Sequence, residues 1–397
     1  MRERSISTAL PHKKTIAKTV SMGIPFSAMK KHWANAAIPA VLFLVFAGIY
    51  LSISNYQNNS NLFLPVWDID HYLSISEVGY QVYPCTPGVE YPAGKICGNA
   101  GWYPLWPLVT KLFRPLLGGS SQLAFIGLAF LFTFLSFQLL YHWLQRAYDR
   151  TTATLATAAL AFSPSGFYFL SGFPYALFVL LFVLYLYFYY YSNFHFRMAC
   201  LFLTALGISL TYPTGLLLVV IPSVGNLRQR LREKGGLKSA SFWVRQILYI
   251  LPFILGPLLL WSYFYFKFDD FFLQLHFQEK YQRTWDFPLT VILHSFSHYP
   301  WDTPENLTLL WYGLAFLLFY PYRVGTELFS FSVIMFLFSP ATGTTMSLYR
   351  HYLIILPLYL MMAASSRPTW FKILYILSGL AISLLKLFPL FLNLKLI

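Results

Sequence analysis

The sequence predicts an all-α polytopic membrane protein. Hydrophobic residues make up 57% of its 397 residues, aromatic residues make up 20% and charged residues only 11%. Soluble domains carry a smaller apolar share and about twice as much charge. The length is sufficient for about ten spanning helices of ~20 residues together with ordered loops. We therefore expect one integral membrane domain over residues 1–397.

The hydrophobic segments that predict these helices fall at roughly 36–54, 121–144, 152–170, 173–192, 198–211, 213–225, 246–267, 307–321, 325–340, 351–365 and 371–392. The two segments on either side of Tyr212-Pro213-Thr214 are too short to cross the hydrocarbon core upright, so we expect a shallow or re-entrant hairpin there. Segment 36–54 is followed by no small-residue cleavage site, which favours a retained anchor helix over a removed signal peptide.

The basic residues predict the orientation of the chain. Residues 1–35 are basic. When the predicted spanning segments are counted from there, most of the 28 Lys and Arg residues fall on the same side of the membrane as residues 1–35, and most of the 14 Asp and Glu residues fall on the opposite side. Basic residues are retained in cytoplasmic loops, so residues 1–35 are predicted to be cytoplasmic. The net charge of +14 is then a topology signal and does not indicate nucleic-acid binding.

Two long loops are expected on the non-cytoplasmic side, at residues 55–120 and 268–306. Long loops are commonly functional, and the first of these is too aromatic to be disordered. The apolar stretch 103–117 in the first loop, interrupted by prolines and basic residues, predicts an interfacial helix on the membrane. The second loop mixes charged with aromatic residues, as a surface for a polar ligand near the bilayer would.

Cysteine is sparse. Cys85 and Cys97 fall in the first long loop, in a compartment expected to be oxidising, so they form a possible disulfide. No Cys-x-x-Cys motif indicates a metal site. We expect neither a metal nor a cofactor.

The densest group of ionisable residues lies at the start of the first long loop. A helix that begins near Asp68 places Asp68, His71, Tyr72 and Ile75 on one face and Asp70 on the opposite face. A carboxylate beside a low-dielectric surface gains basicity, which suits a general base for an acceptor hydroxyl. The alternative is that Asp68 only caps the helix.

The motif Trp67-Asp68-x-x-His71-Tyr72-Leu73-x-Ile75-Ser76-x-x-Gly79-Tyr80, followed by Trp102-Tyr103-Pro104-Leu105-Trp106-Pro107, resembles the PIG-V-like mannosyltransferase family. These enzymes add the second mannose of the glycosylphosphatidylinositol anchor, and they have prokaryotic relatives. Further similar segments are Phe162–Tyr168, Tyr175–Phe178, Pro213–Leu216 and Arg350–Leu353 with Pro357. The chain departs from the family where Tyr212 replaces an arginine and where Pro174 and Tyr175 replace a Thr-Glu pair.

The resemblance implies a GT-C glycosyltransferase fold with a non-cytoplasmic active site, and the hydrophobic segments above predict about eleven transmembrane segments for it. The donor would be a sugar on a polyprenyl phosphate, dolichyl or undecaprenyl, and transfer would invert the anomeric carbon. Asp68 is then the expected base, with His71 beside it. Arg350 is expected to bind the donor phosphate in bidentate fashion, assisted by His351, because phosphate departure needs a cation. The alternative for Arg350 is a snorkelling anchor at a helix end.

Other residues of the two long loops are candidates for substrate binding. They are Trp67, Asp70, Glu77, Tyr103, Trp106, Gln278, Lys280, Arg283 and Trp285. The expected partners are the lipid bilayer, the polyprenyl-phosphate sugar and a glycolipid or other glycan acceptor, with no nucleic acid. The acceptor, the sugar, any small partner subunit and the organism class stay open, so the membrane is the plasma membrane of a prokaryote or the endoplasmic reticulum of a eukaryote.

A polytopic transporter or lipid flippase is the competing class. Such proteins place functional charges at the midplane of broken helices and show repeated halves. Here the charges cluster in the two loops and no repeat is visible. A catalytically inactive relative acting as a partner subunit is disfavoured because Trp67-Asp68-x-x-His71 is retained.

Overall fold

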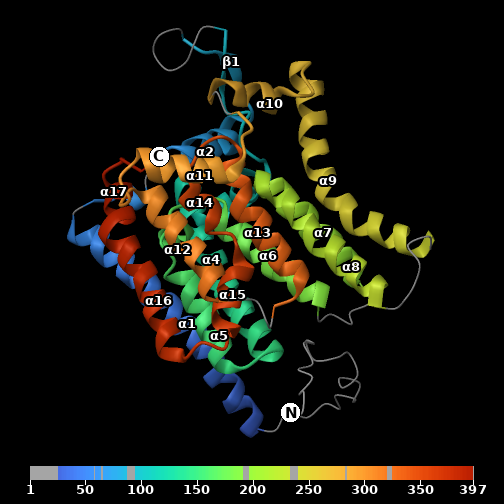
Figure 1. The fold of residues 1–397 in the computed structure, drawn as a ribbon. Coiled ribbons are helices and arrows are strands. Elements are labelled where there is room, and N and C mark those ends of the chain that lie inside the picture. Colours follow the sequence, from blue (N-terminus) through green and yellow to red (C-terminus); the bar gives the residue numbers. More distant parts are fainter. Residues whose placement is uncertain are drawn as a thin grey trace.

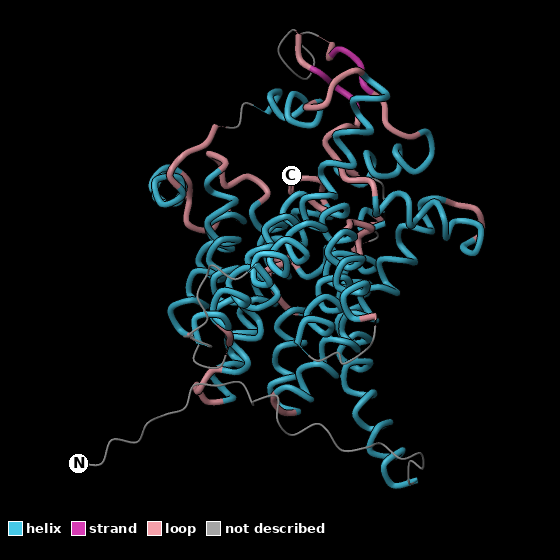
Figure 2. The backbone as a smooth tube through the Cα atoms, turned by 90° about the vertical axis from the view of Figure 1, so that its right-hand side faces the viewer, coloured by secondary structure: helices cyan, strands magenta, loops and turns pink. Residues whose placement is uncertain are grey.

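The computed structural model describes residues 26–57, 59–63, 66–86, 94–190, 196–232, 240–281, 284–319 and 324–396, with side chains from residue 36 onward. These residues are mostly helical, which confirms the all-α prediction. Figures 1 and 2 show a body of packed helices with the two strands at one end.

Four helical stretches among the described residues are long and apolar enough to cross a membrane. They are the part Ala36–Tyr56 of α1 (Phe26–Tyr56), α4 (Ser121–Ala147), α9 (Ala240–Phe268) and the stretch Thr369–Leu392, formed by α16 (Thr369–Ile382), a π-helical turn η6 (Ser383–Leu387) and α17 (Phe388–Leu392). Three shorter apolar helices are α6 (Tyr175–Tyr190), α7 (Arg197–Thr211) and α13 (Thr326–Ala341). Together they support a multi-pass membrane protein.

Proline breaks two segments that the hydrophobicity pattern predicts as continuous. Segment 152–170 forms α5 (Arg150–Ala161) and the 3-10 turn η3 (Gly166–Phe169), with Pro164 between them. Segment 351–365 forms the end of α14 (Leu348–Tyr352) and then α15 (Leu356–Ala364), which has Pro357 in its first turn. Proline lacks the N–H of a helical bond and disfavours helical geometry in the residue before it. The second break leaves α14 as a short, separate helix.

The chain reverses direction after α7, as the hairpin prediction expects. At the start of α7, the Nε of Arg197 donates to the carbonyl of Phe188. Two residues after Phe188, the hydroxyl of Tyr190 donates to Glu327. The 3-10 helix η4 (Pro213–Val219) then leads into α8 (Val220–Arg232), whose Arg228 returns to Glu327. A Cβ at Gly215 would lie 2.5 Å from the carbonyl oxygen of Ile208, so the reversal requires glycine. Tyr212 lies at the apex.

The two long loops meet each other. The first contains η1 (Asn61–Phe63), α2 (Asp68–Val78), the antiparallel strands β1 (Val82–Pro84) and β2 (Ile96–Gly98), α3 (Leu105–Phe113) and η2 (Arg114–Leu117). The second contains α10 (Leu273–Gln278), η5 (Glu279–Tyr281) and α11 (Pro288–His298), and α12 (Pro304–Leu318) follows. Figure 1 shows β1 and α10 together at the upper end of the molecule.

A separate hydrophobic cluster joins these loops to the end of α9. It consists of Ile75, Tyr80, Ala100, Tyr103, Leu260, Phe264, Leu273 and Phe277, and we call it the loop core. Cys85 and Cys97 form a disulfide across the neighbouring strands. The predicted helix in 103–117 is present as α3 and η2, and Leu108, Leu112 and Leu116 form their exposed apolar face.

Candidate functional site

Asp68 and Arg350, far apart in the sequence, form an ion pair. The Nη1 atom of Arg350 lies 2.7 Å from Oδ2 of Asp68, and the two side chains are 11% and 26% exposed. Asp68 is the first residue of α2, and Arg350 is in the middle of the short helix α14. The structure thus brings together the two residues for which the sequence predicts the base and the phosphate ligand.

The guanidinium of Arg350 has a second partner and one unsatisfied donor. Its Nη2 donates to the hydroxyl of Ser347 at 2.7 Å, and its Cζ lies 5.7 Å from the ring centroid of Phe173. Its Nε is buried and has no hydrogen-bond partner among the described residues. A buried donor without an acceptor is costly, so an anionic ligand that reached Arg350 would gain a ready donor.

Unusual backbone geometry precedes both members of the pair. Trp67 has φ 51° and Ser347 has φ 61°, and each residue is the N-cap of the helix that carries a member of the pair. Only four non-glycine residues in the described part of the chain have positive φ. Such conformations are strained for bulky side chains and concentrate at functional sites.

The alternative that Asp68 caps its helix is wrong. The N-cap of α2 is Trp67, and no side chain accepts a capping hydrogen bond there. Asp68 lies one residue further, inside the first turn, and its carboxylate turns to Arg350 instead. The predicted helix face is confirmed, since Tyr72 and Ile75 are buried and Asp70 is exposed.

Two tyrosines form a line of hydrogen bonds that ends at His351. The hydroxyl of Tyr212 lies 3.0 Å from Nδ1 of His351, and the hydroxyl of Tyr175 lies 3.2 Å from that of Tyr212. Tyr175 begins α6 and Tyr212 is the apex of the hairpin, so three separate elements meet at one line of contacts. These tyrosines occupy the positions where the chain departs from the mannosyltransferase pattern, and the two departures contact each other.

Neutral phenols surround the ion pair. Burial, and then the negative charge of Asp68, raise the pKa of Tyr72 well above its ordinary value. Burial raises the pKa of Tyr349 to about 12, although the charge of Arg350 acts in the opposite direction. Both phenols therefore keep their protons at neutral pH, and Asp68 is the acidic group in contact with Arg350.

His71 connects the first motif to the second loop. Its ring stacks on Trp102 with centroids 3.6 Å apart, and Trp102 meets Phe277 of α10 edge-on at 5.6 Å. The ammonium of Lys280 lies 3.7 Å from the ring centroid of Phe277, and Lys280 is buried. The predicted candidates His71 and Lys280 thus lie at the two ends of one row of contacts, with Trp102 and Phe277 between them.

The remaining candidates are scattered. Glu77 is exposed at the end of α2, and Trp67 packs on Phe391 with centroids 5.3 Å apart. Trp285 is 77% exposed. Arg283 lies outside the described residues.

Three aromatic or polar candidates lie within or beside the packed interior. Tyr103 belongs to the loop core, and Gln278 lies at its edge, next to Gly101. Trp106 is fully buried and donates its indole N–H to the carbonyl of Gly172 at 2.8 Å. Trp106 therefore supports the segment before Phe173 and does not line the ion pair.

Two neighbours of Arg350 were not anticipated from the sequence. Ser347 precedes Arg350 by three residues, a spacing that brings two side chains together on one helical turn, so a signal existed. Phe173 lies more than a hundred residues from Arg350 in the chain, and nothing in its local sequence indicates the contact.

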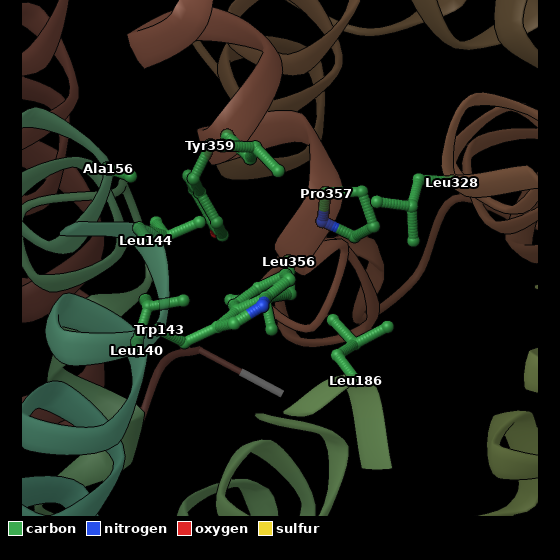
Figure 3. A pocket seen from close by; sticks show the side chains of 10 residues that line it. Leu140, Trp143, Leu144, Ala156, Leu186, Leu328, Leu356, Pro357 and Tyr359 are labelled. Atoms are coloured by element: carbon green, nitrogen blue, oxygen red, sulfur yellow. The ribbon is translucent and has the colours of Figure 1, made fainter. Parts of the chain in front are cut away.

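The central bundle contains a small apolar cavity among the described helices. A cavity of about 10 Å³ lies between α4, α5, α6, α13 and α15 and is lined by apolar groups such as Leu140, Trp143, Leu356 and Pro357 (Figure 3). It has room for about one water molecule. Among the described residues, no cluster of three or more His, Cys, Asp or Glu side chains suits a metal ion.

No protein-family model matches the chain, and no curated protein matches it.

Proposed function

We propose that this protein is a membrane glycosyltransferase with a GT-C-type fold of about eleven transmembrane segments. It would move a sugar, mannose in the leading case, from a polyprenyl phosphate to an acceptor hydroxyl on the non-cytoplasmic face. The contact between Asp68 and Arg350 carries this proposal. This contact places a carboxylate that can accept a proton beside a cation that can bind a phosphate. The two side chains come from α2 and α14, which are far apart in the sequence.

The proposed reaction assigns one task to each charge. Asp68 takes the proton of the acceptor hydroxyl while that oxygen attacks the anomeric carbon from the face opposite the phosphate. The bond from the anomeric carbon to the phosphate oxygen breaks, and the electron pair leaves with the polyprenyl phosphate. Arg350 binds the charge that develops there, and its unsatisfied Nε supplies an additional donor.

The resting ion pair bears on the order of these events. While Arg350 holds Oδ2 of Asp68 at 2.7 Å, an acceptor hydroxyl must compete with the guanidinium for that oxygen. A donor phosphate that binds Arg350 competes for the guanidinium and weakens its hold on Asp68. The carboxylate of Asp68 is therefore released to the acceptor hydroxyl when the donor is in place, so the donor binds before the acceptor reacts.

The direct test replaces Asp68 by asparagine, with the exposed Asp269 as the matched control. Asp68→Asn keeps the size of the side chain and an oxygen that accepts from Arg350, but it cannot take a proton. We expect sugar transfer by purified protein, supplied with polyprenyl-phosphate sugars and glycolipid acceptors, to fall about 10²-fold or more, within the usual range for loss of a general base. Asp269→Asn, at an exposed position directly after α9, should leave transfer unchanged. Equal activity of the two variants would exclude Asp68 as the base.

Arg350 is tested through donor binding. Arg350→Lys keeps a positive charge but loses the planar fork, and it should weaken binding of the polyprenyl phosphate while acceptor binding is preserved. The exposed Arg367, whose Nε donates to the carbonyl of Leu318, provides the control Arg367→Lys. A uniform loss of donor and acceptor binding in Arg350→Lys would contradict the assignment.

A further inference from the structure

A polar cavity lies between α8 and α9, away from the ion pair. It has a volume of about 50 Å³ and is lined by Asn226, Gln229, Arg230, Ser241, Phe242 and Arg245. One water needs roughly 10–15 Å³ by this measure, so the cavity has room for several waters or for one small polar group. Figure 1 shows α8 and the beginning of α9 on the right of the molecule, away from α2 and α14.

The lining follows from helix periodicity. Asn226, Gln229 and Arg230 are spaced i, i+3 and i+4 on α8, so they share one face. Ser241 and Arg245 are spaced i and i+4 on α9. Asn226 is buried, and its amide donates to the side-chain oxygen of Gln246 at 2.8 Å, which fixes the two helices to each other beside the cavity.

The charge of the lining selects an anion. Among the described residues that line it, two are arginines, three are uncharged polar residues and none is acidic. The neighbouring Arg228 lies outside the lining and pairs with Glu327 at 3.2 Å. A guanidinium pair with hydroxyl and amide donors beside it matches the oxygens of a phosphate group.

The surroundings of the cavity distinguish a lipid from a free ion. Leu227 and Leu231 of α8 are 39% and 63% exposed, and Trp243 and Val244 of α9 are 53% and 57% exposed. An exposed tryptophan beside aliphatic side chains is typical of the level where headgroups meet acyl chains. A phosphate in the cavity would thus have apolar surface beside it for the chains that it carries.

We propose that this cavity binds the phosphate of an anionic glycerophospholipid from the cytoplasmic leaflet. Arg230 and Arg245 grip the phosphate from the two helices, and the acyl chains lie along the exposed apolar residues of α8 and α9. The lipid bridges α8 to α9 at the base of the hairpin whose apex carries Tyr212. The site is separate from Asp68 and Arg350, so it does not depend on the function proposed above.

The experiment compares two double variants of equal charge. Arg230→Gln with Arg245→Gln removes the proposed phosphate ligands, whereas Arg146→Gln with Arg150→Gln removes two exposed arginines from the same predicted side without touching the cavity. Each purified full-length protein is titrated with phosphatidylglycerol in phosphatidylcholine vesicles. The unfolding midpoint is recorded, and the retained lipid is counted by native mass spectrometry.

We expect wild type and the control pair to retain phosphatidylglycerol and to gain thermal stability with it, while the cavity pair loses at least tenfold in affinity. If both double variants lost the same affinity for phosphatidylglycerol, the binding would reflect general attraction between basic residues and an anionic membrane. That result would overturn the site. Equal stabilisation by phosphatidylcholine alone would also overturn it. If inorganic phosphate competes at the same concentration, the cavity is a free oxyanion site and the lipid assignment fails.

A single substitution tests the site in case the cavity double variant does not fold. Gln229→Glu changes an exposed residue of the lining at nearly constant size and places a carboxylate beside the proposed phosphate. It should weaken phosphatidylglycerol binding at least tenfold and leave the lipid-free unfolding midpoint unchanged. Unaltered binding in Gln229→Glu would refute the proposal even if the cavity pair failed to fold.

Discussion

Asp68 and Arg350 show what burial does to two charged residues in a chain that has few. Separating either charge from its partner leaves the other one partly desolvated, so the loss of one is more costly than the worth of the pair itself. The strained Trp67 and Ser347 next to them show that the surrounding packing holds this geometry against local preference. The two residues therefore form one energetic unit.

Tyr212 provides a prediction at the residue scale. Tyr212→Phe removes the hydroxyl beside His351 but keeps the ring, so it should lower transfer about threefold to tenfold, the equivalent of one neutral hydrogen bond. Steady-state kinetics with varied donor should place the loss in the KM for the donor.

The control is Tyr175→Phe, which removes only the outer hydroxyl of the same line and should have a smaller effect. If Tyr175→Phe reduces transfer as much as Tyr212→Phe does, the tyrosines act through packing and do not position His351.

At the scale of elements, proline decides where the site forms. The break before α15 separates α14 from the long apolar segment, which lets a five-residue helix turn Arg350 toward α2. The hydrophobicity pattern alone joins these segments because both are apolar. It predicts which residues are buried, but the break in direction depends on the missing N–H of Pro357.

The disulfide gives a prediction for the first loop. Cys85 and Cys97 close a loop of 12 residues, and their replacement by serine should destabilise the strand region by about 2–3 kcal/mol. Limited proteolysis should show faster cleavage between residues 82 and 98, and dithiothreitol should reproduce the effect in wild type. Cys200→Ser serves as the control. Cleavage at the wild-type rate under reduction would show that the loop core holds the strands without the disulfide.

At the scale of the whole molecule, the separation of charge predicts a fixed orientation. In a Cys200→Ser background, single cysteines at Glu77 and Trp301 should react with a membrane-impermeant maleimide from the non-cytoplasmic side. Cysteines at Arg146 and Arg367 should react only after the membrane is opened. All four positions are exposed, so access depends on the side of the membrane and not on burial. Labelling of Glu77 and Arg146 from one side would contradict the topology.

The sequence by itself determined the all-α membrane class, the helix that begins at Asp68 and the hairpin centred on Tyr212-Pro213. Each follows from local chemistry: apolar content, a 3.6-residue period and the effect of proline and glycine on the backbone. It also indicated Asp68 and Arg350 separately, each from its own motif.

Only the tertiary structure decided that Asp68 contacts Arg350, that Tyr175 contacts Tyr212 and that the two loops share one hydrophobic core. These contacts join residues tens to hundreds of positions apart, and local periodicity contains no information about such pairs. It also decided that Trp106 is buried and that Trp67, not Asp68, caps α2, because packing against distant helices overrides the preference of a residue for a cap or an interface. The long-range contacts exist because burying the apolar surface of many helices together fixes which of their polar ends must meet.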